Sequence, residues 1–422
     1  MKEFSEIVAA FEALCAAGKS AALATVISVE GSSYRRPGAR MLIAEDGRIW
    51  GGVSGGCLER DVAARGRGVI ATGRAIVCRY DTGDDEVPSV GASTGCGGAV
   101  ELLIQPISRA FPGPLPQLAR LLNLRQPITI ATVVRADGSL VGSEGTCLAV
   151  EDDPTPESSR GCAVQPQHED GGHCPPYEVR QRVGRALPAA SSEQTSNHEP
   201  LRQGARSAID VSPADAKWPR IIRHTASGGS ADLFIEHLQP PQAIVIFGAG
   251  PDAVPLVTIA KTLGWHVTVV GTRPASAMPQ LFPTADALRV TGSEAPTEGV
   301  ELPSDCAVVV MTHNLARDRA ILERVPPSVR YLGILGPRFR TERIFAEMGE
   351  PAGLSRAFAP VGLDLGAQTP EEIALSIVAE IQAVTHSATS KSLRDRPGPI
   401  HPRAEDEPRP RTSQQVSSAC AV

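Results

Sequence analysis

The pattern of apolar and polar residues in the first 150 positions switches several times between helical and strand periods. Apolar residues at helical spacing predict a helix over 4–14. Short β-branched or alternating runs between glycine-rich and charged turns predict strands. These strands are expected at 21–29, 40–44, 48–50, 76–80, 100–107, 128–134 and 140–150, and further helices at 58–69 and 115–124. Helices that interrupt a set of short strands indicate an N-terminal α+β domain.

The pattern disappears over 151–217, where Pro, Ser, Glu, Gln and Gly dominate and large apolar residues are few. Such a composition is typical of a disordered insertion or linker. Four residues of zinc-ligand type occur in it: Cys162, His168, His173 and Cys174. Their spacing fits no standard zinc module, so a metal-free segment is favoured.

Two short strands follow, at 221–224 and 232–237, around Gly228-Gly229. They predict a hairpin that returns to complete the sheet of the first domain. The N-terminal domain is therefore expected to comprise 1–150 plus 218–238.

Beyond residue 240, the spacing of apolar residues predicts alternating strands and helices, as in an α/β domain. A continuous apolar run at 243–247 predicts a strand buried on both faces, followed by a glycine turn, a helix to 263 and a strand at 266–270. Later strands are expected at 306–312 and 331–335, and helices at 316–324, 338–348 and 370–384. This order predicts a Rossmann-like, doubly wound parallel sheet over 240–386, and the Pro-, Arg- and Ser-rich tail 387–422 is expected to be disordered.

Composition narrows the class of protein. The 422 residues leave room for two domains, and 42% hydrophobic residues suffice for ordinary cores. A net charge of −6 argues against a general nucleic-acid binder. No run approaches the ~18 apolar residues of a membrane span and residues 1–20 lack an export signal, so a cytoplasmic protein with no membrane partner is expected. Nine irregularly spaced cysteines then indicate reduced thiols rather than a disulfide framework.

The chemistry is expected in the loop 51–59, Gly-Gly-Val-Ser-Gly-Gly-Cys-Leu-Glu. Four glycines in six residues permit positive φ and close approach to a ligand, and Gly55 and Gly56 directly precede Cys57. The helix predicted next, with Ser54 or a glycine near its cap, places Cys57 at or near a helix N-terminus, where N–H groups and the dipole favour anions and a thiolate. Three arginines lie upstream: Arg35, Arg36 and Arg40. A functional Cys57 is favoured over a packed thiol.

A second loop, 95–98, repeats this pattern on a smaller scale around Cys96. Cys96 is a secondary candidate for cofactor binding. Taken alone, it is better interpreted as an inert buried thiol in a tight turn.

The turn Gly248-Ala249-Gly250-Pro251-Asp252-Ala253 follows a predicted strand and opens a predicted helix, the context in which GxGxxA is informative. Gly248 would permit the tight turn and Gly250 the approach of a phosphate to the helix N-terminus. An acidic residue normally ends the second strand and binds the ribose, but Gly271 stands there, followed by Thr272 and Arg273. NAD is therefore expected to bind weakly, Gly271→Asp to strengthen it, and Arg273 to favour an additional phosphate. Close strand–helix packing is the alternative role of the turn.

Taken together, these stretches resemble the XdhC/CoxI family, the accessory factors of xanthine dehydrogenase and related molybdenum hydroxylases. One matching stretch contains Gly-Ser-Ser-Tyr-Arg-Arg-Pro-Gly-Ala-Arg-Met at 31–41. The matching segments run in the expected order through both domains: 24–41, 51–59, 95–101, 248–253, 311–314 with Asp318, 331–336, 361–367 and 369–374. Gly271, where the family usually has Asp, and Pro337, where Ser is usual, depart from the pattern.

The resemblance implies a protein that binds molybdenum cofactor, a phosphorylated pterin dithiolene holding molybdenum, rather than an enzyme with ordinary turnover. Such proteins are thought to protect the cofactor, present it to a cysteine desulfurase for exchange of an oxo for a sulfido ligand, and insert it into the apo-hydroxylase. A thiolate such as that of Cys57 suits a soft metal centre, and glycine N–H groups and arginines suit a phosphate and an anionic oxo-metal. Oligomeric state, including a homo-oligomer, stays open.

Two alternatives also stay open. An NAD(P)-dependent oxidoreductase would use the Rossmann-like domain as its main site, with His313 near a strand end as acid–base residue, although His313 is equally well a loop histidine bonded to backbone. A cofactor-free scaffold for a cysteine desulfurase would need neither site. The small molecule that copurifies with the protein distinguishes the three.

Overall fold

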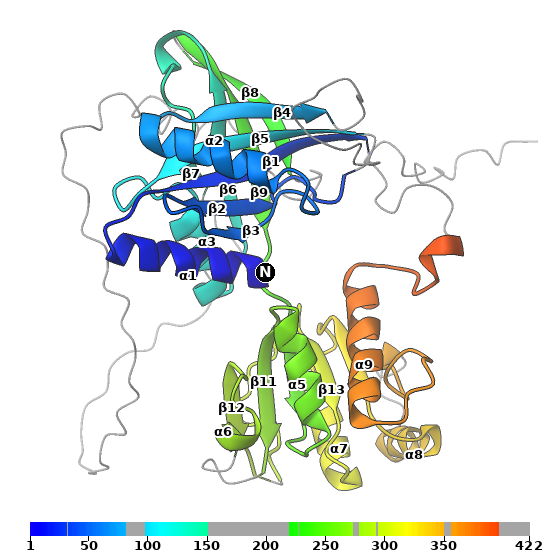
Figure 1. Ribbon diagram of the computed structural model, residues 1–422. Coiled ribbons are helices and arrows are strands. Elements are labelled where there is room, and N and C mark those ends of the chain that lie inside the picture. Colours follow the sequence, from blue (N-terminus) through cyan, green and yellow to red (C-terminus); the bar gives the residue numbers. More distant parts are fainter. Residues whose placement is uncertain are drawn as a thin grey trace, which may run out of the picture. The chain divides into compact units, whose positions relative to one another are not determined.

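The computed structural model describes residues 1–31, 33–81, 98–150, 219–226, 228–272, 278–292, 294–349 and 356–395 (Figure 1). The chain divides into two compact units, an N-terminal unit of Glu3–Pro240 and a C-terminal unit of Pro241–Val422 with Met1–Lys2. The insertion expected over 151–217, with its four candidate zinc ligands, lies outside the described residues, as does the tail beyond 395. In the described part, no helix is both long and apolar enough to cross a membrane.

The N-terminal unit contains two antiparallel sheets (Figure 1). The first sheet has the order β3-β2-β1-β5-β4. Its strands are β1 (Ala21–Gly31), β2 (Arg40–Ala44), β3 (Ile49–Gly51), β4 (Ile76–Asp81) and β5 (Gly98–Ile107). The second has the order β7-β6-β9-β8, with β6 (Ile128–Ala136), β7 (Cys147–Val150), β8 (Arg220–Ala226) and β9 (Gly229–Leu238). The expected hairpin is therefore present as β8 and β9, but it completes this second sheet through pairing of β9 with β6.

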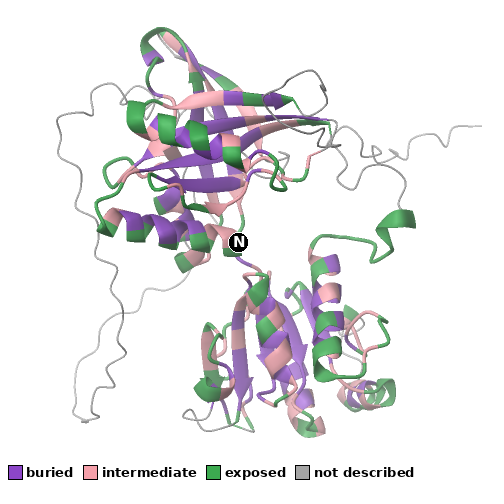
Figure 2. Cartoon of the chain, viewed as in Figure 1, coloured by how far each residue is buried: buried purple, intermediate pink, exposed green. Residues whose placement is uncertain are grey.

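Helices cover both faces of the first sheet. Helix α2 (Glu59–Thr72) packs small and β-branched residues against one face. Helices α1 (Lys2–Ala16) and α3 (Leu115–Leu124) bury their apolar sides on the other. Figure 2 shows the resulting pattern, with buried strands and helices that are buried along one side only.

The prediction of a strand over 140–150 is wrong for most of that range. A 3-10 helix, η1 (Gly138–Leu140), and a turn precede β7, which begins only at Cys147. Gly142 and Gly145 have φ of +92° and +85°, so the chain turns between them instead of extending.

A buried ion pair joins the two sheets. Arg40 of β2 donates to Glu236 of β9, and both side chains are almost completely buried. Burial raises the pKa of Glu236, although the guanidinium of Arg40 opposes that shift. Removing either partner would leave a buried charge uncompensated, so the pair fixes how the sheets meet.

The C-terminal unit is the predicted doubly wound fold. Its parallel sheet has the order β12-β11-β10-β13-β14 (Figure 1). The strands are β10 (Ala243–Phe247), β11 (His266–Gly271), β12 (Ala287–Val290), β13 (Ala307–Val310) and β14 (Tyr331–Ile334). Helices α5 (Ala253–Thr262) and α9 (Pro370–Thr385) cover one face, and α7 (Leu315–Leu322) and α8 (Arg338–Met348) the other. Three short elements were not expected: β12, α6 (Met278–Leu281) and the 3-10 helix η3 (Leu393–Asp395).

Candidate functional site

The loop between β3 and α2 folds around the carboxylate of Glu59, the first residue of α2. Its Oε1 accepts hydrogen bonds from the N–H of Val53 at 3.2 Å and of Ser54 at 2.8 Å, and its Oε2 accepts the Ser54 hydroxyl. The Ser54 Oγ in turn accepts the N–H groups of Gly56 and Leu58, each at 3.1 Å. Burial opposes ionisation, but these bonds from Ser54 and Val53 prevail and lower the pKa of Glu59.

Glu3 of α1 holds the other side of the loop. Its Oε1 accepts the N–H of Gly52 at 2.8 Å, and its Oε2 pairs with the guanidinium of Arg35. Next to Arg35, the Tyr34 ring lies against Gly55, where an added Cβ would sit 3.3 Å from the ring. The glycine loop and the arginine loop therefore lie together, as the sequence suggests.

Cys57 lies two residues before the start of α2 and is a free, exposed thiol. Leu58 is the N-cap and supplies no side-chain cap. Ser54, expected near the cap, lies four residues before Leu58 and accepts its N–H. Gly56 has a φ of +113°, which a residue with a side chain rarely adopts. Within the described ranges, no residue forms a hydrogen bond with the Cys57 sulfur or with the N–H groups of Gly55 and Cys57.

The arginines near this loop have different roles. Arg35 is held by Glu3 and Arg36 is exposed. Arg40 is 1% exposed and bonded to Glu236, so it is a structural residue and not the ligand-facing charge that the sequence suggested. Cys96 lies outside the described residues.

In the C-terminal unit, the structure brings the glycine turn and His313 together. At Gly248, with a φ of +139°, a Cβ would lie 2.4 Å from the carbonyl oxygen of Met311, so close packing on the end of β13 requires glycine. The ring Nε2 of His313 lies 2.7 Å from Oδ2 of Asp252, and a Cβ at Gly250 would meet the other oxygen of that carboxylate at 2.3 Å. These groups follow β10 and β13, the neighbouring strands between which the strand order reverses. Ligands of doubly wound α/β folds bind at this position.

The structure corrects the expectation for Gly271. A Cβ there would lie 2.5 Å from the Cβ of Ala249, the central residue of the glycine turn. Gly271 is thus required by packing, and an aspartate cannot be added to strengthen NAD binding without displacing the turn. Arg273 lies outside the described residues.

The residues that hold these sites in place were not identified from the sequence. Glu59 and Asp252 lie within segments that the sequence singles out, each shortly after a glycine turn, and this position is the signal that would have found them. Glu3 has no such signal, because its partners are distant in sequence. Asp318, fully buried, accepts the Thr312 hydroxyl and pairs with Arg340, which orders the loop that carries His313.

Metal-ligand residue types do not gather in the parts of the chain that the structure describes. No group of three or more His, Cys, Asp and Glu side chains there could hold a metal ion. Among the described residues, Cys57 is therefore the ligand candidate at this loop, without a surrounding group of metal-ligand side chains.

Comparisons with known proteins match both sites. A model of the XdhC and CoxI family matches residues 14–81, which contain the Cys57 loop, and a model of the XdhC Rossmann domain matches residues 244–381. The chain is similar to the XdhC and CoxI family in both of its units.

Two named relatives match nearly nine tenths of the chain. The Bacillus subtilis protein named as a probable subunit of xanthine dehydrogenase is 28% identical over 88% of this chain and 94% of its own length. The Escherichia coli protein named molybdenum cofactor insertion chaperone PaoD is 24% identical over 89% of this chain and 86% of its own length. A crystal structure described as a xanthine dehydrogenase from Bacillus halodurans is 27% identical and superposes with a TM-score of 0.61, covering 93% of this chain and 98% of that one.

Proposed function

We propose that this protein binds molybdenum cofactor as its cargo at the Cys57 loop and delivers it to a molybdenum hydroxylase of the xanthine dehydrogenase type. The observation that carries the proposal is the exposed Cys57 thiol, free of hydrogen bonds to the described residues, on a loop anchored by Glu3 and Glu59. The names of the Bacillus subtilis and Escherichia coli relatives support a role in maturation.

The residues present fit the chemistry of such a cargo. Its metal end is thiophilic, and Cys57 offers a soft sulfur ligand. Its oxo and phosphate oxygens accept hydrogen bonds, and the N–H groups of Gly55 and Cys57 are free donors beside that sulfur. Arg36, exposed on the neighbouring loop, supplies a positive charge for a phosphate.

The geometry also suits transient binding. Because the loop is held by two carboxylates, Cys57 is presented without a large ordering cost on binding. Because Cys57 is open to solvent, a partner can reach the cargo bound there. We propose that a cysteine desulfurase acts on the exposed cargo, exchanging an oxo for a sulfido ligand, before the hydroxylase takes it.

The glycine turn of the C-terminal unit is proposed to bind a phosphate-bearing ligand other than NAD. Gly248 and Gly250 let the turn before α5 pack closely on Met311 and Asp252, and His313, held by Asp252, lies next to this turn. The packing of Gly271 against Ala249 leaves no room for the acidic residue of a standard NAD site, which also disfavours an NAD-dependent oxidoreductase.

The deciding experiment is metal analysis of purified variants. Cys57→Ser keeps size and polarity but removes the soft sulfur, so the variant is expected to fold normally, to copurify with little molybdenum, and to fail to activate an apo-hydroxylase. Cys96→Ser is expected to lose less molybdenum, and Cys15→Ser, on α1, none.

Full molybdenum occupancy in Cys57→Ser would show that the thiol does not hold the metal. Wild-type protein that copurifies with no molybdenum but still binds a desulfurase would favour the cofactor-free scaffold instead.

A further inference from the structure

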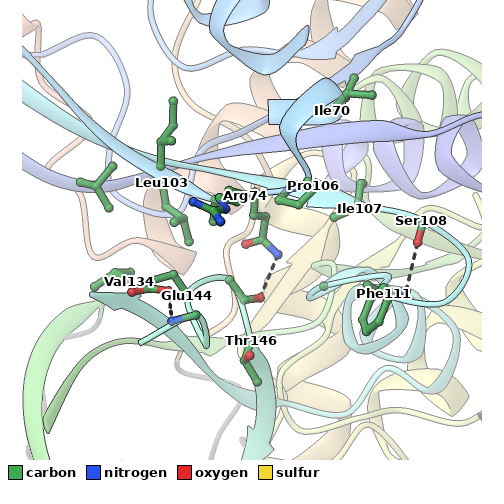
Figure 3. A pocket seen from close by; sticks show the side chains of 18 of the residues that line it. Ile70, Arg74, Leu103, Pro106, Ile107, Ser108, Phe111, Val134, Glu144 and Thr146 are labelled. Atoms are coloured by element: carbon green, nitrogen blue, oxygen red, sulfur yellow. Dashed lines mark hydrogen bonds between the residues drawn. The ribbon is translucent and has the colours of Figure 1, made fainter. Parts of the chain in front are cut away.

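A cavity of about 1050 Å³ lies in the N-terminal unit, at the far end of α2 from Cys57 (Figure 3). The start of β4, the end of β5 and the C-terminal end of α2 line one side of it, and β6 and the turn before β7 line the other. Its volume is at the upper end of the range for small-molecule sites, about 300–1,000 Å³. Since α2 has 14 residues, the cavity and the Cys57 loop are separated by about 21 Å.

Apolar side chains form somewhat more than half of the wall and part of the rim. Leu103, Ile107 and Val134 are buried in the wall. Phe111 and Val141 line the cavity and are 64% and 68% exposed, among the most exposed large apolar residues of the described chain. One such residue on a surface is ordinary, but two on the rim of one apolar cavity indicate that an apolar body fits there.

Among the charged and amide side chains of the cavity, one charge and one acceptor have no partner in the described chain. Arg135 and Glu144 are satisfied, the first by ion pairs and the second by the N–H of Gly142. Arg74 points into the cavity (Figure 3) and has no ion pair or hydrogen bond with any residue that the structure describes.

Gln105 provides the acceptor. It is 2% exposed, and its Nε2 donates to the carbonyl oxygen of Gly145 at 3.0 Å, which fixes the orientation of the amide. Its Oε1 receives no hydrogen bond from the described residues and is not sealed from solvent. A buried amide with a free acceptor and an exposed, unpaired guanidinium line the same cavity, and together they can form the polar half of a binding site.

We propose that this cavity binds a small amphiphilic anion, with an aromatic or branched aliphatic body against the apolar wall and one carboxylate, phosphate or sulfonate on Arg74. A hydroxyl or N–H of the ligand would donate to Oε1 of Gln105. The site is separate from the proposed cofactor loop and does not depend on it.

The test is a titration of the full chain with the fluorescent anion 8-anilinonaphthalene-1-sulfonate. We expect saturable binding that Arg74→Gln weakens by about tenfold, the effect of losing one charge-assisted contact. Val141→Asp, which places a negative charge on an exposed rim position, is expected to weaken it as well. Arg67→Gln, on α2 seven residues before Arg74 and outside the cavity lining, is the control for loss of a nearby arginine. Arg67→Gln and Cys57→Ser should both bind the probe as the wild type does.

Competition defines the ligand class. Octanoate is expected to displace the probe at a concentration about tenfold below that of 1-octanol, because only octanoate carries a charge for Arg74. Inorganic phosphate alone should displace it poorly, because it lacks the apolar body. Absence of saturable binding, equal effects of Arg74→Gln and Arg67→Gln, or equal displacement by octanoate and 1-octanol would each overturn the proposal.

Discussion

The glycines of the Cys57 loop serve different purposes. At Gly51 a Cβ would lie 2.4 Å from the carbonyl oxygen of Arg40, and at Gly55 it would press on the Tyr34 ring. Only Gly56 combines a positive φ with open space around it. The sequence indicates a backbone open to a ligand. In the structure Gly51 is required by packing, Gly55 lies against the exposed Tyr34 ring, and Gly56 leaves space beside Cys57.

Glu59 is expected to stabilise this loop in a pH-dependent way. Glu59→Gln loses charge-assisted bonds from Val53 and Ser54, so urea unfolding at pH 7 should show a loss of about 1–2 kcal/mol. Because the folded state holds the pKa of Glu59 below its unfolded value, this stabilisation is complete above the unfolded pKa, about 4.3, and fades as pH falls through the folded pKa. Equal differences between the two proteins at pH 7 and pH 3 would contradict this.

The Rossmann turn allows a second test on single residues. Gly271→Asp is expected to destabilise the C-terminal unit by about 1–3 kcal/mol, the range for overpacking, and to leave NAD binding weak. Ala249→Gly removes the clashing Cβ, so the double variant should recover stability and gain affinity for NAD, measured by calorimetry. Tight NAD binding by the Gly271→Asp single variant would show that the turn yields more easily than its packing indicates.

At the scale of elements, α9 has the most complete local signal. Thr369 caps it, accepting the N–H of Glu372, while the Glu372 carboxylate accepts the N–H of Thr369. Thr369→Ala is therefore expected to lower the free energy of unfolding of the C-terminal unit by about 1 kcal/mol, measured as a lower thermal midpoint. Thr369→Ser keeps the acceptor and serves as the control; equal losses in the two variants would exclude the cap as the cause.

Periodicity predicted most long elements well but not how they are grouped. The strand expected at 243–247 is β10, and the helix at 338–348 is α8, because burial on both faces or along one side leaves a clear pattern. Strand β12 was missed because it has four partly exposed residues and lies at a sheet edge. The division of the N-terminal strands into two sheets was also missed, since partner choice depends on contacts distant in sequence.

The same limit applies to the sites. Residues 51–59 and 248–253 were found from the sequence because glycine clusters are unusual. The roles of Glu3 and Arg40 were not found. Residue type alone does not show whether a charged side chain pairs with another residue of the protein or faces a ligand.

At the scale of the whole molecule, the chain leaves the second sheet from the edge strand β7 and re-enters it at the opposite edge strand β8. Val150 of β7 pairs with Thr129, which in turn pairs with His237, and Arg220 of β8 pairs with Ile235, two residues from His237. The exit and the re-entry therefore lie at the same end of the four strands. Three strand spacings separate β7 from β8, about 14 Å.

Removal of residues 155–215 is therefore expected to preserve the fold. It leaves 151–154 and 216–219, about eight residues that can span about 26 Å. We expect the thermal midpoint to stay within about 2–4 °C of the wild type. Removal of 155–226, which also deletes β8, should lower it much more, and a similar large loss in the shorter deletion, or loss of stoichiometric zinc, would show that the insertion is structural.

The ion pair between Arg40 and Glu236 also has a consequence for synthesis on the ribosome. Its partners are 196 residues apart, which corresponds to about 10–40 s of translation at about 5–20 residues per second. During that interval β2 has emerged, but the carboxylate that neutralises its inward-facing arginine has not. Until β9 emerges, the guanidinium must stay hydrated, so the face of the first sheet that later meets the second cannot close, and nascent chains paused before residue 236 should be the species most in need of a chaperone.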